Sequence, residues 1–144
     1  MSIGAKRKMT STIPSLDDLK LLARTVAERA YAPYSRFHVG AAVRSASGKI
    51  FAGCNVENAS YSLTCCAERN AVFQMVANGE RRFDAIAIYT PTPEPTAPCG
   101  ACRQVLFEFG PDAEVVSFCD GAGQLISTVR SLLPGAFGPE NLGK

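Results

Sequence analysis

Residue types that could do chemistry are concentrated in two short stretches, LTCCAERNAV (63–72) and PCGAC (98–102). In the second stretch, Cys99 and Cys102 have the C-x-x-C spacing, which at the start of a helix lets both sulfur atoms reach one metal ion. The free N–H groups and the dipole of the first helical turn favour thiolates. On its own, this motif is open to three interpretations: zinc ligands, a redox pair, or two core cysteines.

The first stretch adds a third thiol and a carboxylate. Cys65 and Cys66 stand side by side ahead of Glu68, at the start of a second predicted helix. A thioredoxin-like redox pair would follow the first strand of its fold and would lack a third thiol partner, so metal binding is favoured. Two helix N-termini directed at one point would supply three thiolates and stabilise their negative charge.

The number of ligands decides whether a zinc site is catalytic or structural. Three protein ligands leave one position open, whereas a fourth closes the site. The fourth could in principle be one of four other residues, but none of them belongs to a second ligand pair at zinc-knuckle spacing. Glu68 favours the open site, because a zinc-activated water needs a base to take and return its proton. The four possible closing ligands are Cys54, Cys65, Cys119 and His38.

Three thiolates on Zn²⁺ leave a net charge near −1, which would weaken the power of the metal to acidify water. Positive groups should offset that charge. Arg69 follows Glu68 directly, and Arg103 follows Cys102 directly. We expect at least one of these arginines to donate hydrogen bonds to ligand sulfurs, as groups around metal ligands commonly do.

The elements that must position these residues follow from hydrophobic periodicity. We predict one domain, 15–144, preceded by a flexible N-terminal extension, 1–14. A helix, a β-hairpin and two helix–strand pairs indicate a three-layer α/β/α fold with a mixed sheet of about five strands flanked by helices. The final residues, 134–144, are expected to form an irregular tail. The predicted helices are 15–30, capped by Ser15, then 66–79, 99–109 and a short one near 129–133; the predicted strands are 38–45, 50–56, 83–90, 113–119 and 123–128.

Composition excludes several classes of protein. The chain has 144 residues, of which 47% are hydrophobic and 19% charged, which is typical of a globular domain. Its net charge of +2 is too small to indicate a nucleic-acid partner. The apolar runs are too short for a bilayer, and no signal peptide is visible, so we expect a cytoplasmic protein without a membrane partner. In that reducing compartment, clustered thiols bind metal more often than they form disulfides.

Several motifs together resemble the zinc-dependent nucleoside deaminases, and most closely the small homotetrameric cytidine deaminases. The C-A-E and P-C-x-x-C signature of zinc deaminases is present. The resemblance runs from about Ala30 to the C-terminus, in the order and spacing of that family. It covers YAPYSRFHVGAAV, GCNVENASY, TCCAERNA, PCGACRQV and LLPGAFGPENL.

The resemblance implies hydrolytic deamination of cytidine and 2′-deoxycytidine with release of ammonia, as in pyrimidine salvage. It implies one Zn²⁺ per subunit, with Glu68 as the group that shuttles protons. It also implies a homotetramer whose active sites are shared between subunits. The implied zinc ligands are Cys66, Cys99 and Cys102.

The resemblance also implies residues that hold the substrate. Asn55 and Glu57 would hold the ribose hydroxyls, and their spacing of two places both side chains on one side of an extended segment. Phe37 would pack on the base, and the backbone near Ala67 would contact its polar edge. Further implied contacts come from Tyr61 and Phe137, which would reach the site of a neighbouring subunit, and from Tyr34.

Three questions stay open at the level of sequence. Cys65 is extra relative to the signature, so the ligand could be Cys65 or Cys66, although the spacing to Glu68 selects Cys66. Rival functions are deamination of another cytosine-like substrate, such as an aminoacyl-nucleoside antibiotic or a base in nucleic acid, and a non-catalytic zinc-stabilised interaction module. The sequence does not separate cytidine from 2′-deoxycytidine.

Overall fold

A five-stranded mixed sheet forms the middle of the protein, whose computed structural model describes residues 12–144. The strand order is β2-β1-β3-β4-β5. Only β3 and β4 run parallel; the other neighbouring pairs are antiparallel. The strands are β1 (Gly40–Ser45), β2 (Ile50–Cys54), β3 (Phe83–Tyr89), β4 (Glu114–Phe118) and β5 (Gln124–Thr128); the helices are α1 (Leu16–Ala27), α2 (Ala67–Ala77), α3 (Gly100–Phe109) and α4 (Val129–Leu132).

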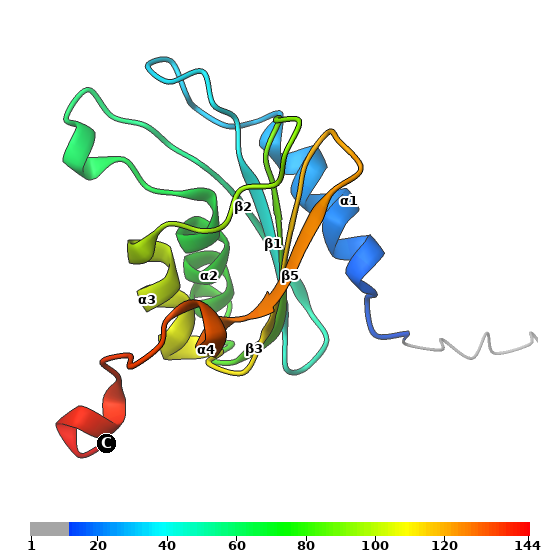
Figure 1. Cartoon of the computed structure of the whole chain (residues 1–144). Helices are drawn as coiled ribbons and strands as arrows, with labels where there is room; N and C mark the ends of the chain where they lie inside the picture. Colours follow the sequence, from blue (N-terminus) through cyan, green and yellow to red (C-terminus); the bar gives the residue numbers. More distant parts are fainter. Residues whose placement is uncertain (1–11) are drawn as a thin grey trace, which may run out of the picture.

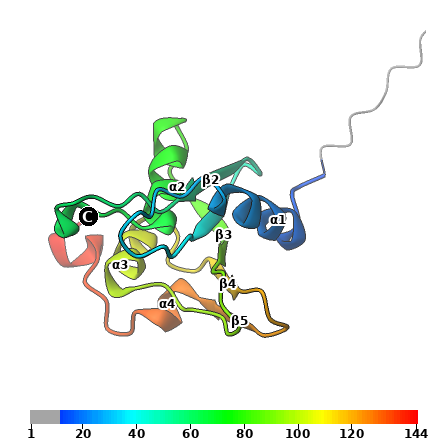
Figure 2. The same ribbon diagram turned by 90° about the horizontal axis from the view of Figure 1, so that it is seen from above.

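Helices cover both faces of this sheet. Figures 1 and 2 show α1 on one side, and α2 and α3 together on the other. Strand β3 alternates between the two layers: Ala85 and Ala87 face α1, whereas Ile86 and Ile88 face the opposite core. The predicted three-layer α/β/α fold is therefore confirmed, and β3 is buried against helices on both of its faces.

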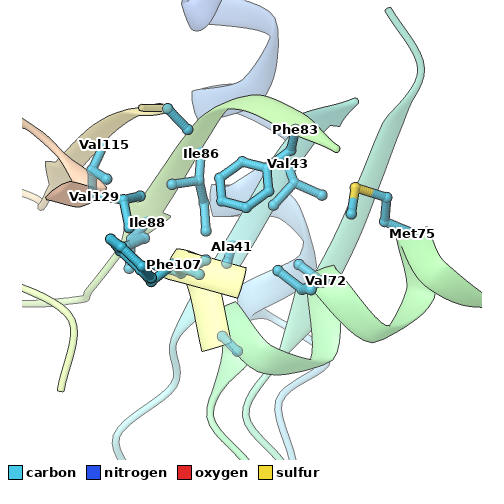
Figure 3. Packing of buried hydrophobic residues seen from close by; sticks show 14 of the residues in the cluster. Ala41, Val43, Val72, Met75, Phe83, Ile86, Ile88, Phe107, Val115 and Val129 are labelled. Carbon is cyan, nitrogen blue, oxygen red and sulfur yellow. The ribbon is translucent and has the colours of Figure 1, made fainter. Parts of the chain in front are cut away.

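The larger core lies between the sheet and the helices that carry the cysteines. Figure 3 shows Val72 and Met75 of α2 and Phe107 of α3 packed against Val43 and Ile86 of the sheet. Close approach of α2 to β2 depends on Gly53, because a Cβ there would lie 2.3 Å from the backbone nitrogen of Ala71. This core fixes the position of α2 relative to the end of β2.

Helix α1 begins as predicted but ends early. Ser15 accepts a hydrogen bond from the backbone of Asp18, whose side chain bonds back to Ser15, which is a complete capping box. The helix ends at Ala27 rather than at residue 30. Beyond it the chain turns, and the N–H of Tyr31 bonds to the carbonyl of Asn55, so pairing with the segment after β2 ends the helix.

Two short 3₁₀ helices were not predicted from the sequence. One spans Tyr61–Leu63, and the other, Pro139–Leu142, lies in the tail expected to be irregular. Most of the predicted N-terminal extension, residues 1–11, lies outside the described residues. Within residues 12–144, no helix is both long enough and apolar enough to cross a membrane.

Candidate metal centre and adjoining pocket

Three thiols converge where two helices begin. Cys66 is the N-cap of α2, Cys99 is the N-cap of α3, and Cys102 lies in the first turn of α3. Their sulfur atoms all lie within 4.8 Å of one another, and the sulfurs of Cys66 and Cys99 are 3.9 Å apart. A tetrahedral zinc ion with Zn–S bonds of about 2.3 Å holds its sulfurs about 3.8 Å apart, so this donor set fits one zinc ion.

The first-turn N–H groups of both helices have no capping side chain and are free to face this centre. Neither Cys66 nor Cys99 makes a side-chain capping hydrogen bond. The N–H groups of both first turns therefore present partial positive charge near the sulfurs, where it stabilises thiolates. Cys102 is buried, whereas Cys99 is exposed, so the cluster is closed on one side and open on the other.

Arg69 is the arginine that contacts a sulfur. Its Nη2 lies 3.4 Å from the sulfur of Cys66 and also bonds to the carbonyl of Thr64. The neighbouring Cys102 thiol and the guanidinium of Arg69 lower the pKa of the Cys66 thiol to about 5. Arg103 instead donates to two carbonyls, of Pro98 at 2.7 Å and of Leu132 at 2.9 Å, and so holds the loop before α3 in place.

Glu68 adjoins the cluster from the first turn of α2. Its side chain is buried, and its Oε2 accepts a hydrogen bond from the thiol of Cys102 at 3.3 Å. Burial raises the pKa of this carboxyl, because desolvation disfavours its charged form. Because its pKa is raised, a carboxyl placed beside the thiol ligands is suited to exchanging protons near neutral pH.

The open side of the cluster faces a cavity of about 330 Å³. Four residues predicted to hold a substrate line it together with Glu68: Phe37, Asn55, Glu57 and Ala67. Sequence reasoning missed part of the wall, because nothing in the types or spacing of those residues marks them. They are Ser35, Val39, Thr64, Thr90, Thr96 and Ala97.

The polar end of the cavity is built by Asn55 and Glu57. The Asn55 amide accepts from the N–H of Val39 at 2.8 Å and donates to the carbonyl of Phe37 at 2.6 Å. An amide group has two N–H donors and two acceptor lone pairs, so one of each remains. Glu57 accepts hydrogen bonds from the hydroxyl and N–H of Ser35, which lower the pKa of its carboxyl and favour the ionised form.

Three predicted substrate residues do not line this cavity. The rings of Tyr34 and Tyr61 lie edge to face, with centroids 5.8 Å apart, and border a separate, adjoining groove. Phe137 is 60% exposed, and its carbonyl accepts a hydrogen bond from Gln104. Within residues 12–144, the other candidate ligands are not part of the sulfur cluster. They are Cys54, Cys65, Cys119 and His38.

Replacement of the adjacent cysteines distinguishes the two possible ligands. We expect Cys66→Ser to lose most of the bound zinc, because one of three converging sulfurs is removed. Cys65→Ser should keep one zinc ion per subunit, because its thiol lies outside the cluster. Elemental analysis of the purified variants measures this directly. Zinc loss from Cys65→Ser alone would overturn the assignment of Cys66.

Replacement of Arg69 should make zinc binding more sensitive to acid. Arg69 lowers the pKa of Cys66, so Arg69→Gln raises that pKa and lets protons compete with zinc at higher pH. We expect the midpoint of zinc release on acidification to move up by about one pH unit. Arg69→Lys, which keeps the positive charge, is the matched control and should shift less. Identical release curves for all three proteins would contradict this role.

Comparison with known proteins agrees with this geometry. Residues 15–119 match the family model described as "Cytidine and deoxycytidylate deaminase zinc-binding region". A cytidine deaminase of Sporosarcina psychrophila is 47% identical over 130 residues, covering 88% of this chain and 96% of that protein. The crystal structure of cytidine deaminase from Burkholderia pseudomallei is 49% identical, with a TM-score of 0.82 over 85% of this chain and 99% of that one. The chain therefore belongs to the cytidine and deoxycytidylate deaminase family, whose zinc-binding region it contains.

Proposed function

We propose that this protein hydrolyses the 4-amino group of cytidine and 2′-deoxycytidine, releasing ammonia and forming uridine and 2′-deoxyuridine. One observation carries the proposal: the buried carboxyl of Glu68 adjoins a three-thiol cluster and lines the same cavity as Phe37, Asn55 and Glu57. The family membership and the cytidine deaminases at 47% and 49% identity support the same reaction.

The reaction needs one group that takes and returns protons. When bound by Cys66, Cys99 and Cys102, zinc would act as a Lewis acid that acidifies water. Glu68 takes a proton from the attacking water and delivers it to N3 of the ring. It then transfers the second proton of that water to the amino group, which leaves as ammonia while the C4 carbonyl forms. Its raised pKa suits both directions of transfer.

The remaining cavity residues suit a free nucleoside. The ionised Glu57 accepts hydrogen bonds from sugar hydroxyls, and the spare donor and acceptor of Asn55 reach the same sugar. Phe37 packs on the base, and the backbone at Ala67 contacts its polar edge. Cytidine and 2′-deoxycytidine share the 3′-hydroxyl, so we propose that both are substrates.

We further propose a homotetramer with one zinc ion per subunit and active sites shared between subunits. Tyr34, Tyr61 and Phe137 are exposed aromatic side chains outside the cavity, which suits contact with a neighbouring subunit. We also propose that residues 15–144 form a single domain. All six cysteines are free thiols, which suits a reducing cytoplasm and a role in pyrimidine salvage.

Replacement of the proton-transferring carboxyl separates an enzyme from a structural zinc module. We expect Glu68→Gln to lower kcat by at least about 10³-fold, since an amide cannot carry the protons, while zinc content stays unchanged. The loss of cytidine absorbance in the ultraviolet measures turnover, and elemental analysis measures zinc. Full turnover in this variant would refute the role of Glu68, and a wild type without turnover would refute the proposed activity.

Replacement of the exposed aromatic near the C-terminus tests the shared site. If Phe137 completes the site of a neighbour, Phe137→Ala should raise KM for cytidine by about tenfold and weaken the assembly. Steady-state kinetics and analytical ultracentrifugation measure the two effects. Leu142→Ala, which removes another exposed apolar side chain of the same tail, is the control. Unchanged KM and unchanged mass for Phe137→Ala would exclude this contact.

A further inference from the structure

We propose that Asn70 is a positioning residue, which sets the spacing between the sugar-binding segment and the metal centre. The inference deepens the proposed function and rests on it, because it concerns how the same pocket selects the sugar. Asn70 does not line the cavity. It lies in α2, one turn after Cys66, and acts through the main chain of other residues.

One side-chain amide joins two segments that are distant in the sequence. The Nδ2 of Asn70 lies 2.8 Å from the carbonyl oxygen of Cys54 and 3.4 Å from that of Cys65. Cys54 ends β2 and directly precedes Asn55, whereas Cys65 directly precedes Cys66. Both acceptors are therefore the peptide carbonyls that lead into the pocket and into the metal centre.

The same two segments are also joined by main-chain hydrogen bonds. The N–H of Val56 bonds to the carbonyl of Cys65, and the N–H of Cys65 bonds to the carbonyl of Val56, each at 2.9 Å. Val56 lies between Asn55 and Glu57, so this reciprocal pair sets where both polar side chains stand relative to Cys66. The extra cysteine thus contributes its peptide group rather than its thiol.

The side-chain amide of Asn70 ties the bridge between Val56 and Cys65 to helix α2. On its other side Val56 bridges Tyr31, which follows α1, so that second bridge does not tie the segment to the thiols; the pair with Cys65 has only two hydrogen bonds to keep its register. Asn70 shares the carbonyl of Cys65 with Val56, and it also donates to the carbonyl of Cys54, which pairs with Gly40 at the end of β2. Without the amide, the segment carrying Asn55 and Glu57 can move relative to the thiols while the thiols stay in place.

Two variants at this position and one control test the proposal. Asn70→Ala removes the donor, and Asn70→Asp replaces it with an oxygen that faces two carbonyls. Gln74→Ala is the control, because Gln74 lies one turn further along α2 and, like Asn70, lines a surface groove outside the substrate cavity. Each holoenzyme is assayed with cytidine and with 2′,3′-dideoxycytidine, which keeps the 5′-hydroxyl but lacks the 2′- and 3′-hydroxyls and so gains nothing from groups placed to hold those two.

We expect KM for cytidine to rise about tenfold in Asn70→Ala and further in Asn70→Asp. Zinc content and kcat should stay within about twofold of wild type, and kcat/KM for 2′,3′-dideoxycytidine should also change less than twofold. Gln74→Ala should match wild type throughout. Equal losses for both nucleosides, a loss of zinc, or an unchanged KM for cytidine would overturn the positioning role.

A second measurement does not depend on activity. Amide hydrogen exchange of the holoenzymes should show faster exchange at Val56 and Cys65 in Asn70→Asp, and wild-type exchange there in Gln74→Ala. Unchanged exchange at both amides, or faster exchange spread over the whole chain rather than centred on this bridge, would overturn the inference. Failure of wild type to deaminate cytidine would instead refute the proposed function, and the exchange result would still decide whether Asn70 holds the bridge.

Discussion

The whole arrangement depends on holding three sulfur atoms close enough together to bind one metal ion as thiolates. Repulsion between such groups is severe at separations near 4 Å in a partly buried site. Two helix N-termini and the guanidinium of Arg69 offset it, because each places positive charge against the sulfurs. This electrostatic requirement explains why the cysteines occupy N-cap or first-turn positions and why α2 and α3 must begin side by side.

The sheet and the hydrophobic cores on its two faces fix the positions of the helices, and this brings the three sulfur atoms together. On the α1 side, the sheet presents Ala42, Ala85 and Ala87, which let that helix lie close. On the other side, larger residues such as Ile86 and Ile88 support α2 and α3. Gly53 then allows α2 to approach the end of β2, so the metal centre and the segment carrying Asn55 lie next to each other.

Much of this could be predicted from the sequence, where the signal is local. The C-x-x-C spacing, the position of Glu68 relative to Cys66, and the capping box of Ser15 all depend on a few neighbouring residues. The order of helices and strands follows from periodicity, which is a local property as well. The converging sulfurs and the five-stranded sheet agree with those expectations.

What the sequence did not predict depends on contacts between distant segments. Thr90 and Thr96 enter the cavity wall because the end of β3 and the loop before α3 fold over it, and neither residue type signals this. The early end of α1 comes from a bond between Tyr31 and Asn55. The bridge between Val56 and Cys65 is equally invisible in residue patterns, because main-chain groups make it.

The absence of side-chain caps on α2 and α3 has a consequence for folding in the cell. A helix without a capping side chain has lower stability at its first turn. Here the thiolates of the metal centre would stabilise the first turns in place of capping side chains. Metal binding and helix formation are therefore thermodynamically coupled. A ligand that binds only the folded chain raises its stability with the logarithm of ligand concentration. The folded fraction of newly made chains would therefore rise with the free zinc level.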